Sequence, residues 1–130
     1  MKLFLLASLG GAIGAGARYL VNGVCAQCMA PGFPWATFIV NVVGSFLMGV
    51  VVASMLPYLG GSAVWRTFLA TGILGGFTTF SAFSLDAMTL LEKQQFNLLA
   101  VYVVGSVVVS VLALAAGVGV VRVALNLDLK

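Results

Sequence analysis

The chain has 130 residues, of which 62% are hydrophobic and only 7% are charged. Soluble domains carry about 25% charged residues, so this chain would expose hydrophobic surface as well as bury a hydrophobic core. Lipid is therefore its expected solvent. The net charge of +3 is spread thinly and without a basic run, which argues against nucleic acid as a partner.

The hydrophobic segments predict an all-α integral membrane protein with four spans in one domain, residues 1–130. A spanning helix needs about 20 apolar residues, so a chain of this length has room for four helices and short loops. The expected spans cover about residues 3–24, 35–56, 64–91 and 98–124. Trp35 is expected at a membrane interface, and Pro57 is expected to end the second span.

The first 17 residues also resemble a signal peptide. Lys2 precedes an apolar run that reaches the small residues Ala15, Gly16 and Ala17, a pattern typical of a cleavage site. Two glycine pairs inside that apolar run favour an uncleaved first span.

The charges outside the spans give only a weak orientation signal. Four spans place Lys2, Arg66, Arg122 and Lys130 on one side, and Lys93 with Arg18 on the other. This is a slight bias by the positive-inside rule. A chain with so little bias is expected to insert both ways, and an antiparallel dimer would follow. The charge count alone leaves that hypothesis open.

Pairs of small residues predict close contacts between helices. Gly10 and Gly14 form a GxxxG pair, and Ser45 and Gly49 form a small-xxx-small pair. Small residues let helix backbones approach closely in lipid, where no hydrophobic force drives association. We expect these pairs to be packing surfaces.

The third span is too long and too rich in glycine for a straight helix. Residues 63–91 would form a helix of about 43 Å against a hydrocarbon core of about 30 Å. Its middle, residues 72–81, contains three glycines followed by two threonines, which are poor helix formers. A break there would free backbone groups to face a polar path. The alternative is a packing face whose threonines bond back to their own helix.

Polar residues inside the spans indicate a hydrated route. Asn41 lies early in the second span with Thr37 one turn before it, and an unpaired amide in hydrocarbon costs several kcal/mol. Tyr102, Ser106 and Ser110 recur every four residues along the fourth span. Hydroxyl groups also hold helices together, so the stripe favours a route without requiring one.

The remaining polar residues allow more than one interpretation. Arg18 is either a functional intramembrane charge or a side chain that snorkels to the headgroups, and Asp86 has no evident partner. Cys25 and Cys28 form a CxxC, which we interpret as apolar filling at a helix end because a metal site needs four ligands. With three carboxylates, none evidently paired, and no histidine, the chain is not expected to be an enzyme.

Three motifs resemble those of the Fluc/CrcB fluoride channels. Residues 10–19 read GGAIGAGARY and resemble the GGxxGAxxRY opening of that family. Residues 41–49 read NVVGSFLMG and are similar to NxxGxFxxG, and residues 72–83 read GILGGFTTFSAF and are close to GxxGGxTTFSTF. The match covers three spans in the right order, and Ala82 replaces the usual threonine.

The resemblance implies an antiparallel, dual-topology homodimer with two fluoride pores in the bacterial inner membrane. It implies a structural Na+ at the dimer interface, held by the backbone carbonyls of Gly75 and Thr78 of each subunit. Arg18 would lie at a vestibule. The implied pore residues are Thr37, Asn41, Phe80, Ser81, Phe83, Tyr102, Ser106 and Ser110.

The implied function is passive export of fluoride down its electrochemical gradient. Fluoride is small and strongly hydrated, so a pore must replace its water with donors such as the Asn41 amide, while ring edges of Phe80 and Phe83 offer positive charge. A small multidrug-type transporter is a second hypothesis, but it needs a carboxylate in the first span, which has none. A non-conducting accessory subunit is a third, and it would not require a continuous hydrated path.

Overall fold

The structure is a computed structural model that describes residues 1–126, with the side chains of residues 56–59 outside the description. Its elements are all helical: α1 (Lys2–Cys28), α2 (Trp35–Leu59), α3 (Ala63–Trp65), η1 (Arg66–Leu74), α4 (Gly75–Phe77), α5 (Phe80–Glu92) and α6 (Phe96–Ala124). Four segments, with α3 to α5 counted as one, are long and apolar enough to cross a membrane. The all-α class and the four spans are confirmed.

The helix ends differ from the expected ones chiefly at α1 and α2. α1 continues to Cys28, four residues past the expected end. α2 continues through Pro57, so the prediction that this proline ends the helix was wrong. Gly60 ends it instead, with a left-handed backbone (φ 56°) and an amide that donates to the Met55 carbonyl. Glycine adopts this conformation without the steric cost that a side chain would add.

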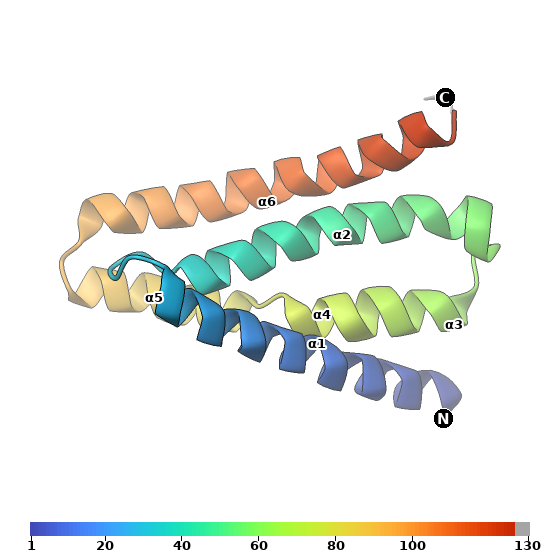
Figure 1. Ribbon diagram of the computed structural model, residues 1–130, viewed down its shortest axis with the longest axis horizontal. Coiled ribbons are helices and arrows are strands. Elements are labelled where there is room, and N and C mark those ends of the chain that lie inside the picture. The colour runs from blue at the N-terminus through green and yellow to red at the C-terminus, as the bar shows by residue number, and fades with distance from the viewer. Residues whose placement is uncertain (127–130) are drawn as a thin grey trace.

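The four spans run up and down through the molecule (Figure 1). α2 packs chiefly against α6, and α1 crosses η1 and α4. The start of α1, the start of α3 and the end of α6 lie at one end, and the α1–α2 and α5–α6 connections lie at the other. Lys2 and Arg66 therefore share an end, as expected; Lys130 lies outside the described residues.

Glycines bring the backbones of α1 and the third span into direct contact. A Cβ atom on Gly10 would lie 2.6 Å from the Phe68 carbonyl oxygen, and one on Gly14 would lie 2.7 Å from the Phe77 nitrogen. Both distances are shorter than any side-chain carbon tolerates. Gly49 contacts α6 in the same way, 2.9 Å from the Val118 nitrogen. The packing role predicted for these three glycines is confirmed.

The first half of the third span is a π-helix, an unusual form for nine residues. η1 runs over Arg66–Leu74, and the amide of Gly75 donates to the Ala70 carbonyl, five residues back. π-Helices are rare and occur mostly as single-turn bulges, which are frequent at functional sites. Gly72 and Leu74 are the buried residues of this segment, which lies against α1.

Large apolar side chains are exposed along the spans. Phe4 is 69% exposed on α1, Leu85 67% on α5 and Val111 64% on α6. The largest fully buried side chains are Val40 and Tyr102. Such an outside agrees with lipid as the solvent, because a protein in water rarely leaves so much apolar surface uncovered.

Candidate functional site

Two residues of extended backbone separate α4 from α5. Thr78 has φ −76° and ψ 159°, and Thr79 has φ −153° and ψ 122°. Thr78 remains tied to the helix before it, because its amide and its Oγ1 both donate to the Leu74 carbonyl, each at 3.0 Å. Thr79 turns away from α4 and begins α5, where its Oγ1 accepts from the Ala82 amide at 3.2 Å.

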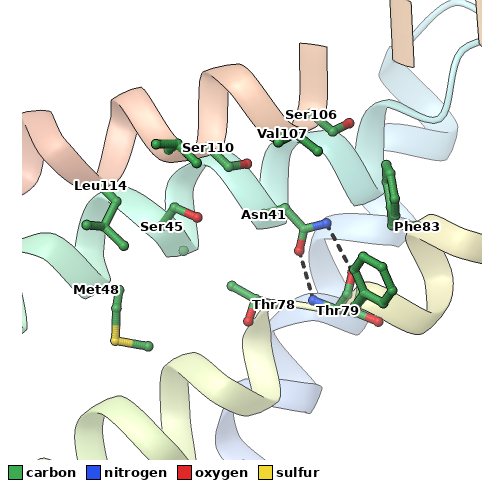
Figure 2. Close-up of a pocket in the computed structure, with 13 residues that line it drawn as sticks. Asn41, Ser45, Met48, Thr78, Thr79, Phe83, Ser106, Val107, Ser110 and Leu114 are labelled. Carbon is green, nitrogen blue, oxygen red and sulfur yellow. Dashed lines mark hydrogen bonds between the residues drawn. The ribbon is translucent and has the colours of Figure 1, made fainter. Parts of the chain in front are cut away.

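The side chain of Asn41 holds the extended segment. Its Oδ1 accepts from the Thr79 amide at 2.8 Å, and its Nδ2 donates to the Thr79 carbonyl at 3.0 Å (Figure 2). A carboxamide carries both a donor and an acceptor, so this single side chain satisfies both backbone groups of one residue. Leaving them unpaired away from water would cost about 1–3 kcal/mol each.

The same arrangement takes the usual donors away from two backbone carbonyls. In an α-helix the Gly75 carbonyl accepts from the Thr79 amide, and the Thr78 carbonyl accepts from the Ala82 amide. Here the Thr79 amide donates to Asn41 and the Ala82 amide donates to Thr79 Oγ1. The carbonyls of Gly75 and Thr78 are therefore available to another partner.

A hollow of about 400 Å³ lies between α2, α5 and α6 and reaches the α4–α5 junction. In Figure 2 the side chains of Asn41, Ser45 and Ser110 face this space. Met48 and Leu114 lie at its apolar end. The lining residues are Asn41, Gly44, Ser45, Met48, Thr78, Thr79, Phe80, Phe83, Ser106, Val107, Ser110, Val111 and Leu114.

Two hydroxyl groups on the wall of this hollow have no partner. The Oγ atoms of Ser106 and Ser110 are buried and make no hydrogen bond within the described part of the chain. Buried polar groups are normally paired, so an exception needs an explanation. Asn41 adds to this unpaired polarity, because only one of its two amide hydrogens is used on Thr79.

Two phenylalanine rings flank the polar wall. Phe80 and Phe83 both line the hollow, and their ring centroids are 5.5 Å apart. Phe80 is 78% exposed at the start of α5, whereas Phe83, one turn later, lies partly buried against Tyr102.

A second hollow of about 620 Å³ opens beside Asp86, near the α1–α2 connection. Asp86 Oδ2 accepts from Thr37 Oγ1 at 2.6 Å and from the Tyr102 hydroxyl at 3.1 Å. Asp86 therefore has two partners that sequence analysis did not identify. Asn22, Thr37, Ala82 and Asp86 are among the residues that line this hollow, so Ala82 faces it with a methyl group.

The structure brings together some of the predicted site residues and separates others. Asn41, Phe80, Phe83, Ser106 and Ser110 meet at the first hollow. Thr37 lies at the second hollow, and Tyr102 is fully buried. Ser81 is exposed with its Oγ 3.3 Å from Thr79 Oγ1; Gly75 is exposed at the start of α4, and Arg18 lies half-buried on α1.

Sequence analysis missed the direct role of Thr79. The sequence motif gave a site role only to Thr78, through its carbonyl, yet it is Thr79 that pairs with Asn41 and caps α5, while the Thr78 hydroxyl bonds back to its own helix. A threonine three residues before a helical amide is a recognisable N-cap signal. The two cysteines are free. Cys25 is buried, as filling requires, but Cys28 is exposed, so the filling role predicted for both cysteines does not hold for Cys28.

Comparison with known proteins identifies the family. The family described as CrcB-like protein, Camphor Resistance (CrcB), matches residues 5–118. The chain is 55% identical over 118 residues to the fluoride-specific ion channel FluC of Cereibacter sphaeroides, covering 91% of this chain and 93% of the relative. It is 48% identical over 120 residues to the fluoride-specific ion channel FluC 2 of Nitrobacter hamburgensis, covering 92% and 96%. The chain therefore belongs to the CrcB-like protein family.

Proposed function

We propose that the protein is a fluoride-selective channel through which fluoride leaves the cytoplasm passively across the bacterial inner membrane. Its relatives carry the name fluoride-specific ion channel. The observation that carries the proposal is the pair of buried serine hydroxyls beside Asn41 that have no partner among the described residues. A desolvated anion would supply the acceptor that these hydroxyls lack.

The chemistry of the hollow suits fluoride in transit. Fluoride gives up its hydration shell only where protein donors replace the water. Ser106 and Ser110 on α6 and the second amide hydrogen of Asn41 on α2 are neutral donors that border the same hollow. Neutral donors bind an anion less tightly than a lysine would, and conduction needs sites that are weak enough to release the ion.

The two phenylalanines supply a different kind of contact. Hydrogen atoms at the edge of an aromatic ring carry partial positive charge. We assign Phe80 and Phe83 as contacts that the ion meets next to the serine wall. Ser81, whose exposed hydroxyl lies beside Thr79 Oγ1, adds a donor close to them.

The route continues from the hollow toward the second hollow. Thr37 and Tyr102 lie on this part, with both hydroxyls donated to Asp86. Arg18, half-buried on α1, acts at a vestibule, where its charge raises the local concentration of anions. Asp86, which accepts both of these hydroxyls, is the charged side chain that lines the second hollow.

The functional unit in this proposal is an antiparallel, dual-topology homodimer, in which the α4–α5 junction is a functional break at membrane depth. Phe80 lines the hollow and is nevertheless 78% exposed, so the wall on that side needs a neighbour. A second copy in the opposite orientation would provide it. The weak charge bias of the chain favours insertion both ways.

The carbonyls of Gly75 and Thr78 are the ligands that we assign to a structural Na+ at the dimer interface. They fit such an ion, because hard cations prefer oxygen ligands and the usual helical donors of both carbonyls are engaged elsewhere. Bound there, Na+ would supply positive charge and tie the two α4–α5 junctions together.

Fluoride efflux from liposomes that contain the purified protein tests the proposal. Wild-type protein should release fluoride and retain chloride. Asn41→Asp and Phe80→Ile should reduce the flux sharply without changing the dimer measured by size in detergent, and Asn97→Asp, at the exposed start of α6, is the matched control. Well-folded wild-type protein that releases no fluoride, or that conducts chloride equally, would contradict the channel assignment.

The same assay tests the assigned ion. Preparation with an organic cation in place of Na+ should lower the flux and the melting temperature together, because the cation would tie the two junctions of the dimer. Equal flux and equal stability without Na+ would remove the metal from the proposal and leave the fluoride assignment intact.

A further inference from the structure

The Tyr102 ring lies between an aromatic residue of the first hollow and one of the second. The lining of the first hollow and that of the second share no residue. The Tyr102 ring lies 5.3 Å from the Phe83 ring, which lines the first, and 5.5 Å from the Phe33 ring, which lines the second. The Tyr102 side chain is fully buried. The Tyr102 ring therefore contacts one wall residue of each hollow.

The Tyr102 side chain is held at both ends. Its hydroxyl donates to Asp86 Oδ2 at 3.1 Å. Its ring meets Phe83 at an interplanar angle of 36° and Phe33 edge to face at 87°, and edge-to-face pairs are a favoured arrangement of aromatic rings.

Phe33 is the contact of Tyr102 that comes from a loop and not from a helix. It lies in the connection between α1 and α2, outside both helices. Its ring is held in turn by Trp35, with centroids 4.6 Å apart, and by Phe38, at 5.7 Å. This aromatic cluster, Phe33, Trp35 and Phe38, reaches from the end of the molecule onto the Tyr102 ring.

We infer that Phe33 is a positioning residue that keeps Tyr102 closed as a gate between the two hollows. The inference rests on the proposed conduction of fluoride. With the Phe33 ring in place, Tyr102 leaves its position only briefly and the opening admits a small anion. Without that ring, the tyrosine moves out more often and farther, and larger anions pass.

The ratio of chloride to fluoride efflux from liposomes tests the gate. Phe33→Ala and Phe33→Leu should raise this ratio by about threefold or more, the size expected when one aromatic pair is lost. Phe33→Trp restores a ring and should return the ratio toward the wild-type value. Phe96→Ala removes the same side chain from a site that is 60% exposed, and it should leave the ratio unchanged.

A double-variant comparison separates a gate from a merely structural role. If Phe33 acts through Tyr102, Phe33→Ala should add little to the ratio in a Tyr102→Ala background, because coupled residues are not additive. A structural role would lower the amount of folded protein without changing the ratio. If Phe33→Ala does not fold, Phe33→Leu, which keeps most of the apolar volume, provides the comparison.

The outcomes distinguish this inference from the function on which it rests. No fluoride release by well-folded wild-type protein contradicts the channel assignment itself. Selective fluoride release by wild-type protein, with an unchanged ratio in folded Phe33→Ala or Phe33→Leu, overturns only the gate. The gate is also overturned if Phe33→Ala raises the chloride-to-fluoride ratio by the same factor in the wild-type protein and in the Tyr102→Ala protein.

Discussion

Small residues lie both at the α1 contact with the third span and in the wall of the hollow between α2, α5 and α6, but only the first is closely packed. At the first, Gly10 and Gly14 meet backbone atoms of η1 and α4 directly. At the second, Ser106 and Ser110 face an open space of about 400 Å³. The glycines at the first region allow direct contact between helix backbones. The serines at the second region instead border a space that their hydroxyls face.

Asn41 belongs to neither region alone and determines how they meet. It lies on α2, at the edge of the hollow, and binds the Thr79 backbone just after α4. α4 is pressed against α1 by Gly14. The Asn41 side chain thus connects the close contact with the hollow. Substitutions in the close contact, at Asn41 and in the hollow test how the two regions differ.

The largest effect is expected at the close contact. Gly14→Val would place side-chain carbons on the Phe77 nitrogen and the Gly76 carbonyl carbon, 2.7 and 3.0 Å from the Cβ position. Because backbone cannot yield as a side chain can, we expect a loss of at least about 3 kcal/mol. Thermal unfolding in detergent measures it.

Gly16 provides the matched control for this substitution. A Cβ atom there would meet nothing within 4 Å. Gly16→Val should melt within a few degrees of the wild-type protein. Equal melting temperatures for the Gly14 and Gly16 variants would mean that α1 does not pack against the third span as described.

A smaller loss of folding stability is expected at Asn41, which joins the two regions. Asn41→Ala leaves the amide and carbonyl of Thr79 without their partner, which should cost about 2–4 kcal/mol. Fluoride flux should fall with it, because the wall also loses a donor. Asn97→Ala, at an exposed position, should change neither quantity. An Asn41→Ala protein as stable as the wild type would refute the pairing with Thr79.

The smallest effect on stability is expected in the hollow itself. Ser106→Ala removes a buried hydroxyl that has no partner within residues 1–126 as described, so the free energy of unfolding should stay within about 0.5 kcal/mol of the wild-type value or rise. Fluoride flux should fall about three- to tenfold, the size of one hydrogen bond lost in transit. Ser54→Ala is the control, because the Ser54 hydroxyl is bonded within its own helix. A stability loss as large as that of Asn41→Ala would show that the hydroxyl has a structural partner.

Local features of the sequence predicted the helices and much of the wall of the hollow. The four-residue spacing of Ser106 and Ser110 placed both hydroxyls on one face of α6, and the structure has them on the same wall. Pro57 does not end α2. A proline removes one helical hydrogen bond and crowds the carbonyl four residues back, yet the helix continues to Leu59 and the left-handed Gly60 ends it.

Tyr102 shows that helical periodicity does not predict hydrogen-bond partners on other helices. It belongs to the same stripe as Ser106 and Ser110, yet its hydroxyl donates to Asp86, while theirs have no partner in the part of the chain that the structure describes. Helical spacing tells which residues share a face. It does not tell which of them meets an acceptor on another helix.

The sequence by itself determined the all-α class, the four spans, the close glycine contacts and the resemblance to a family, because these depend on composition and on neighbours within a few turns. Only the tertiary structure decided which polar groups are paired. Asn41 and Thr79 are 38 residues apart, and Thr37 and Asp86 are 49 apart. Hydrogen bonds form only within about 3 Å, so whether such groups meet depends on how the helices pack.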